Sequence, residues 1–235
     1  MVGKNRSLTP KGSSTWTGIF VGLVLFGLLA AGGIGGTLVQ LPAMQAMRRS
    51  AAELLSLDSV QLMWFITRAS GLTGYVLLWL STVWGLVVSS KALDALMHRS
   101  FTYDFHEFLS LPAIGFIGVH IAVLMADHYL PFTLSQILVP FLAPYRPFWV
   151  GIGVLAFYLT LLVTVTFYMR RRIGMRAFRW IHLSSFLAFL GAAGHGLMAG
   201  TDSSLPLTQV LYASTLLVVV FLTTYWATLR LLTKW

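Results

Sequence analysis

Six long apolar segments dominate this sequence and restrict the folds that it can adopt. The segments are residues 16–39, 64–88, 103–125, 148–169, 178–198 and 208–232. Each is long enough to cross the hydrocarbon core of a bilayer as a helix, which takes about 20 residues. In lipid the backbone must satisfy its own hydrogen bonds, and a helix does so within one segment. We therefore expect an all-α membrane protein with six transmembrane helices.

Composition supports this interpretation. Hydrophobic residues make up 57% of the 235 residues and charged residues only 10%, which is too little charge to cover the surface of a soluble domain. Six spans would use about 120 residues, and a separate soluble domain would need about 100 more. We expect only short ends and connections, so that any partner chemistry comes from another polypeptide.

The predicted order begins with a cytoplasmic tail at residues 1–15 and a first transmembrane helix at 16–39. An amphipathic outer connector at 40–62 and a core at 63–232 follow. The connector after the third span contains four prolines and is too broken for another span. We expect it to lie at the interface or to re-enter the membrane partly.

Orientation follows from the basic residues, because Lys and Arg concentrate in cytoplasmic connections. Twelve of the 16 fall in the N-terminal tail, the connectors after the second and fourth spans, and the C-terminal tail. Both termini are therefore predicted to be cytoplasmic, in a multi-pass protein of the cell inner (plasma) membrane. The net charge of +9 is then mainly an orientation signal and does not indicate a nucleic-acid partner.

The chain has no cysteine, which excludes disulfides, thiolate metal sites and iron–sulfur ligation. If the protein carries electrons, His or Met must hold the cofactor. Nothing in the sequence resembles a Gly-rich nucleotide loop, a serine nucleophile with its base, or paired acid–base carboxylates. We therefore assign no catalytic residue.

Four histidines lie within two of the spans, and their spacing suggests a ligand set. They are His106 and His120 in the third span, 14 residues apart, and His182 and His195 in the fifth span, 13 residues apart. These spans run in the same direction, so one histidine of each is expected near the cytoplasm and the other about 20 Å further out. Neutral imidazoles are good axial ligands for haem iron, and two of them leave no open coordination position. The pattern predicts two haem b groups, one above the other, each with bis-His iron.

Two further readings of the histidines remain open. A single intramembrane histidine can be a core residue hydrogen-bonded to a neighbouring helix, but four at matched depths are more typical of function. His98 and His128 lie in connectors and are interpreted as solvated or interfacial, with His128 as a reserve outer ligand.

The helical phase of the fifth span does not fit this ligand set directly. At about 100° per residue, 14 positions fall about 40° short of four turns, whereas 13 positions fall about 140° short. The glycine-rich stretch at 191–196 is a candidate to absorb the difference, through a kink or a local change of winding. These glycines, together with Gly115 and Gly118, are also expected to give a flat macrocycle access to the helix backbone.

Three motifs resemble a known family. They are ITRASGLTGYVLLWLS at 66–81, RRRIGMRAFRWIHLSSF at 170–186 and HGLMAGTDS at 195–203. Together with the histidine spacings, they resemble the ferric reductase-like transmembrane family over about residues 60–232. That family includes the membrane portions of ferric reductases and NADPH oxidases, and the haem-binding membrane subunit of periplasmic methionine sulfoxide reductase.

The resemblance implies a di-haem four-helix-type core with an extra N-terminal helix. It also implies that His106, His120, His182 and His195 are the axial ligands. Electrons would flow from the cytoplasm to an outer-face acceptor protein or metal ion. Ferric reductases continue into a flavin domain that is not expected here, so a separate flavoprotein, an iron–sulfur protein or quinol would be the donor to this electron-transfer subunit of an oxidoreductase.

Haem propionates need cationic partners at the membrane edges. Arg179, three residues before His182, and Arg68, at the start of the second span, are the predicted cofactor-binding cations, with Arg176 and Arg146 as further candidates. Asp202 is interpreted as a hydrated loop residue. Two other functions remain open: a quinol-oxidising cytochrome b subunit, and a haem-free scaffold or packing subunit of a larger complex, suggested by the Gly-rich first span.

Overall fold

The computed structural model describes residues 59–91, 93–94, 96–127 and 132–232, and in this part of the chain it is built from helices without strands. The predicted tail, the first span at 16–39 and most of the outer connector lie outside the described residues. So does His128.

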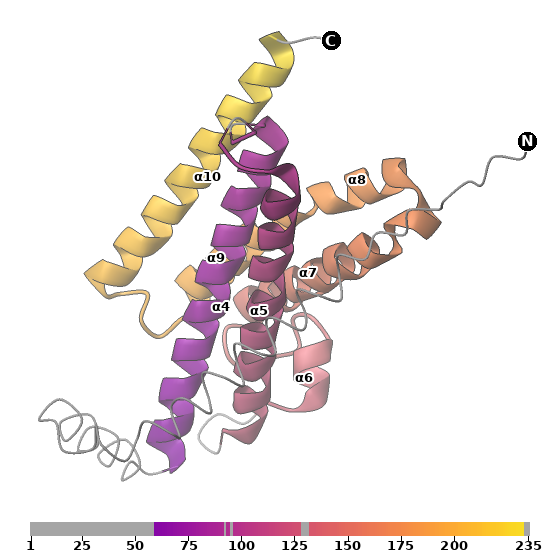
Figure 1. Ribbon diagram of the computed structural model, residues 1–235. Coiled ribbons are helices and arrows are strands. Elements are labelled where there is room, and N and C mark those ends of the chain that lie inside the picture. The colour runs from indigo at the N-terminus through magenta and orange to yellow at the C-terminus, as the bar shows by residue number, and fades with distance from the viewer. Residues whose placement is uncertain (1–58, 92, 95, 128–131, 233–235) are drawn as a thin grey trace, which may run out of the picture. The chain divides into compact units, whose positions relative to one another are not determined.

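Seven helices make up the described part (Figure 1). They are α4 (Ser59–Ser90), α5 (Arg99–Ala126), α6 (Leu134–Leu138), α7 (Pro147–Ile173), α8 (Met175–Leu183), α9 (Ser185–Ala199) and α10 (Pro206–Leu232). Five stretches are long and apolar enough to cross a membrane, with α8 and α9 together forming one of them. They coincide with the five spans predicted after residue 63, so the described region is that of a multi-pass membrane protein.

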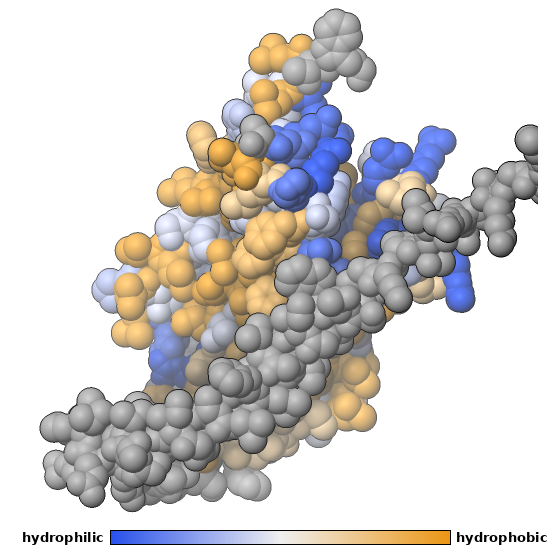
Figure 2. All heavy atoms as spheres, in the orientation of Figure 1, coloured by the Kyte–Doolittle hydropathy of each residue, from blue (hydrophilic) through white to orange (hydrophobic). Residues whose placement is uncertain are grey.

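The outward faces of these helices are apolar. Side chains buried inside the protein make up only 11% to 33% of the most apolar window of each span. On α10, Leu217 and Phe221 are each 69% exposed, and apolar side chains cover much of that helix (Figure 2). A surface of this kind is stable against lipid and unstable against water.

Aromatic rings and a pair of hydroxyls join α4, α9 and α10. The ring of Tyr75 stacks on Phe189 at 5.8 Å between centroids and tilts against Tyr212 at 4.7 Å. The Tyr75 hydroxyl shares a hydrogen bond with Thr215 Oγ1. These contacts pack α9 and α10 against α4.

The connector between α5 and α7 folds back on the ends of those two helices. The five-residue helix α6 is far too short to cross a membrane, which agrees with the predicted absence of a span here. Phe132, Ile137 and Ala143 of the connector are buried, and Leu124 of α5 and Val150 of α7 pack against them.

The fifth predicted span is broken into two helices, and the break lies outside the predicted place. Residues 191–196 form an uninterrupted part of α9. The helix is interrupted at Ser184, whose N–H donates to the carbonyl of Ile181 three residues earlier at 3.0 Å. Because α8 and α9 are separate helices, the phase difference predicted for one continuous helix does not apply.

Two residues mark the ends of α7. Pro147 occupies the first turn, where the missing N–H of proline does no harm. Gly174 ends the helix with φ of +82° and is also the residue before α8. Only glycine takes this conformation without strain, which allows the chain to turn sharply from α7 into α8.

Candidate functional site

The structure brings the four intramembrane histidines together in two pairs. The rings of His106 and His182 lie 5.9 Å apart between centroids, and those of His120 and His195 lie 6.4 Å apart. These are the two pairs that the depth argument predicts. We call His106 and His182 the inner pair, and His120 and His195 the outer pair, after the predicted orientation. Each pair joins α5 to the α8–α9 segment.

Backbone carbonyls orient both imidazoles of the outer pair. Nδ1 of His120 lies 2.8 Å from the carbonyl oxygen of Thr67, and Nδ1 of His195 lies 3.0 Å from that of Trp149. A carbonyl oxygen can only accept a hydrogen bond, so Nδ1 must carry the proton in both rings. In a neutral imidazole this leaves the lone pair on Nε2 free to bind a metal.

The inner pair has a weaker set of partners. Nδ1 of His106 lies 3.4 Å from the hydroxyl of Ser81, which is 2.8 Å from the hydroxyl of Ser110. Nδ1 of His182 is buried and has no hydrogen-bond partner among the described residues. The ring of Phe178 lies 5.2 Å from the His182 ring. The two pairs are therefore chemically different.

Three glycines face the histidine rings. A Cβ at Gly71 would lie 2.9 Å from Nδ1 of His120, and one at Gly153 would lie 2.6 Å from Nδ1 of His195. A Cβ at Gly85 would lie 3.2 Å from Cε1 of His106. These distances are shorter than ordinary van der Waals contacts, so the rings approach α4 and α7 because side chains are absent there.

The glycines predicted to admit a macrocycle are in part used differently. A Cβ at Gly191 would lie 3.1 Å from that of Ala156, and one at Gly196 would collide with the hydroxyl of Tyr212. These two glycines therefore permit helix packing. A Cβ at Gly115 or Gly118 would meet nothing within 4 Å.

A cavity of about 470 Å³ adjoins the inner pair. His106 and His182 line it, together with three arginines from two segments, Arg176, Arg179 and Arg230. Arg179 and Arg176 were predicted as cationic partners at this level, whereas Arg230 was not. The indole nitrogen of Trp226, also in the lining, is buried without a hydrogen-bond partner in the described part. The cavity thus combines two imidazoles with a concentration of positive charge.

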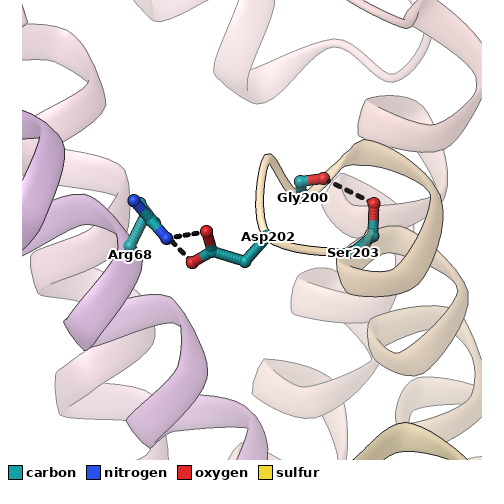
Figure 3. A network of polar contacts seen from close by, with 4 residues as sticks. All are labelled: Arg68, Gly200, Asp202 and Ser203. Carbon is teal, nitrogen blue, oxygen red and sulfur yellow. Dashed lines mark hydrogen bonds and ion pairs between the residues drawn. The ribbon is translucent and has the colours of Figure 1, made fainter. Parts of the chain in front are cut away.

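Arg68, predicted as the outer cationic partner, has a carboxylate partner within the protein. Its guanidinium forms an ion pair with both oxygens of Asp202 (Figure 3) and lies 3.7 Å above the ring of Trp64. Asp202 lies in the connection after α9, as predicted, and its side chain is 32% exposed, but its carboxylate pairs with Arg68. This pairing was not predictable from spacing, because 134 residues separate the two partners.

The segment before α7 caps the end of α9 that follows His195. Arg146 donates to the carbonyl of Met198, and the hydroxyl of Tyr145 donates to that of Ala199 at 3.2 Å. The last carbonyls of a helix have no partner within it, so these two side chains stabilise its end. Of the connector histidines, His98 is exposed, in agreement with its predicted role.

The donor set fits haem better than a protein-only metal centre. Among the described residues, no group of three His, Cys, Asp or Glu side chains could hold a metal ion. Haem iron needs only axial ligands from the protein. Metal–imidazole bonds of about 2 Å on opposite sides of an ion would put the ring centroids about 6 Å apart, close to both separations seen here. Comparisons with family models, curated proteins and solved structures find no match for this chain.

Proposed function

We propose that this protein is a di-haem b-type cytochrome that carries electrons across a membrane. The observation that carries the proposal is the presence of two imidazole pairs at two depths between the same two helical segments. Along α5, 14 residues correspond to about 20 Å. Two carriers at these levels would connect most of the about 30 Å hydrocarbon core.

Each pair has features that suit its role. The carbonyls of Thr67 and Trp149 hold the outer rings in one tautomer, which also raises the basicity of the ligating nitrogen. At the inner pair, Arg176 and Arg179 in the cavity lining supply positive charge for propionates. When bound, haem supplies one-electron chemistry at an iron without an open coordination position.

The residues of the chain then determine the direction of transfer. The basic residues hold one end of the bundle at the cytoplasmic face. In a membrane that is negative inside, outward transfer of one electron is favoured by about 2.3 kcal/mol per 100 mV. The proposed path runs from a cytoplasmic-side donor to an outer-face acceptor protein or metal ion across the cell inner membrane, in the manner of ferric reductase-like membrane subunits.

A separate flavoprotein, an iron–sulfur protein or quinol is the proposed electron donor. One observation favours quinol oxidation as a second candidate function. A hollow of about 40 Å³ beside the inner pair is lined by Glu107 and Tyr168, whose hydroxyl donates to the carboxylate at 2.7 Å. A carboxylate next to a redox centre can accept a proton. Reduction of the purified protein by a short-chain quinol would separate this candidate from a protein donor.

An absorption spectrum of the purified protein tests the haem proposal. We expect reducible b-type Soret and alpha bands, which disappear when all four histidines of the two pairs are replaced by alanine. A protein without these bands would be a haem-free scaffold instead, and bands that survive the fourfold replacement would also contradict the proposal.

Single replacements test how the ligands are paired. His106→Ala and His182→Ala should each remove the same haem, and His120→Ala and His195→Ala should each remove the other. Redox titrations of the four variants identify which centre is lost. His98→Ala, which changes an exposed histidine outside both pairs, serves as the control and should retain both centres. Loss of the same centre in His106→Ala and His120→Ala would overturn the pairing.

A further inference from the structure

The ion pair between Arg68 and Asp202 joins two parts of the chain that each support the outer histidine pair. Arg68 lies in α4, and Asp202 lies in the connection between α9 and α10. Two guanidinium nitrogens contact the two carboxylate oxygens (Figure 3). Two-point contacts of this kind restrict orientation as well as distance. The pair thus fixes α4 relative to the connection.

On the α4 side, the ion pair is adjacent to the support of His120. The residue before Arg68 is Thr67, whose carbonyl oxygen accepts the hydrogen bond from Nδ1 of His120 at 2.8 Å. The guanidinium is also held over the ring of Trp64 at 3.7 Å. A displacement of this part of α4 would therefore move the acceptor that orients the His120 ring.

On the other side, Asp202 closely follows the helix that carries His195. That helix ends at Ala199. The turn from Ala199 to Asp202 is compact. The N–H of Gly200 donates to the carbonyl of Gly196 at 3.1 Å, and Ser203 Oγ donates to the carbonyl of Gly200 at 2.9 Å. A displacement of Asp202 would therefore also displace the last turn of α9.

We propose that Arg68 and Asp202 are positioning residues for the outer histidine pair, and that their ion pair holds the support of His120 in register with the end of α9. This inference rests on the proposed haem function. It assigns Arg68 a role other than the expected contact with a haem propionate, because two of its three guanidinium nitrogens contact a carboxylate of the protein.

A charge-exchange experiment tests the proposal. Arg68→Gln and Asp202→Asn should each weaken haem binding at the outer pair by roughly 10-fold, the low end of the range for residues that orient metal ligands, and each should shift the midpoint potential of the haem that remains there. The inner centre should be unchanged. The exchange Arg68→Asp with Asp202→Arg should restore the outer centre in large part. Arg68→Lys should give haem binding between that of the wild type and that of Arg68→Gln, because lysine keeps the charge but cannot make the two-point contact of a guanidinium.

A second ion pair of the chain provides a matched control. It lies at the start of α5, away from the end that carries His120. Arg99 and Asp94 form an ion pair of 3.3 Å, with side chains 57% and 37% exposed, against 24% and 32% for Arg68 and Asp202. Exposed pairs of this kind contribute little, so Arg99→Gln and Asp94→Asn should leave both centres unaltered.

The outcomes distinguish this proposal from its premise. An effect of Arg68→Gln without an effect of Asp202→Asn would mean that Arg68 acts on the cofactor directly, and would overturn the proposal. The proposal would also be overturned if Arg68→Gln and Asp202→Asn both left haem binding and the midpoint potential of the outer centre unchanged. It would likewise be overturned if the charge exchange did not restore the outer centre. A wild-type protein without haem bands would refute the proposed function itself.

Discussion

At the scale of single residues, hydrogen bonding determines how each imidazole can be used. The carbonyls of Thr67 and Trp149 leave the outer rings one defined free nitrogen each. The inner rings lack acceptors of this strength, and Nδ1 of His182 has none in the described part of the chain. The two proposed haems would therefore differ in ligand basicity although all four ligands are histidines.

The positions of the glycines on α4 match those of the histidine rings that they face. Gly71 and Gly85 on α4 are 14 residues apart, the same spacing as His106 and His120 on α5. Each lies against one of those rings. This matched spacing is a sequence signal that could have identified them.

Gly153→Ala is expected to disturb the outer pair. The added Cβ would lie 2.6 Å from Nδ1 and 2.7 Å from Cγ of His195, so the ring must move away from its acceptor, Trp149. We expect outer haem content to fall roughly 10-fold, measured as haem per protein and by redox titration.

Leu155→Ala is the matched control for this prediction. Leu155 lies on the same helix as Gly153 and its side chain is 39% exposed, so this change leaves the close approach of His195 to Gly153 as it is. This variant should keep both centres. Normal haem content in Gly153→Ala would show that the ring does not depend on this close approach.

At the scale of elements, the interruption between α8 and α9 has the largest consequence for the site. It allows His182 and His195 to face the same helix although 13 residues of a continuous helix would turn them apart. The hydroxyl of Ser184 donates to the carbonyl of Ile181 at 2.6 Å. Such bonds compete with the regular pattern and bend helices, so they favour an interruption at this residue.

Ser184→Ala should make the α8–α9 segment more nearly continuous. Because Tyr145 and Arg146 anchor the far end of α9, we expect α8 to move and His182 to turn away from His106. The measurement is the ratio of the two haems by redox titration, with selective loss of the inner one.

Ser214→Ala provides the comparison for Ser184. The Ser214 hydroxyl makes the same type of bond, to Leu211 at 3.0 Å, on an exposed face of α10. Its removal should leave both haems in place. Equal behaviour of the two serine variants would mean that packing alone causes the interruption.

At the scale of the whole molecule, the predicted orientation can be measured directly because the chain has no cysteine. Single cysteines can replace Leu96, in the connector between α4 and α5, and Ser204, between α9 and α10; both positions are exposed. A membrane-impermeant maleimide added to intact cells should label Ser204→Cys. It should label Leu96→Cys only after the membrane is opened.

The opposite labelling pattern would reverse the orientation of the bundle and with it the proposed direction of electron flow. Labelling of both variants in intact cells would place both connectors on one face, which the three spans between them do not permit. Either result would leave the pairing of the histidines as it is, because that pairing depends only on contacts within the bundle.

The sequence by itself determined which stretches are helical spans and at which depths the histidines lie. Both are one-dimensional properties, set by apolar length and by the rise per residue along a helix. This is why the five spans after residue 63 and the partners of His106 and His120 were predictable. Outside the described residues, the span at 16–39 stays a prediction.

The tertiary structure decided what depends on rotation about the helix axes and on contacts between distant segments. The close approach of Gly153 to His195 follows from how α7 and α9 pack, which no single helix determines. Asp202 lies in the connection after α9, and its partner was not predictable because it lies 134 residues away in the sequence. Only folding brings Arg68 and Asp202 together, because contacts between distant segments depend on how the helices pack.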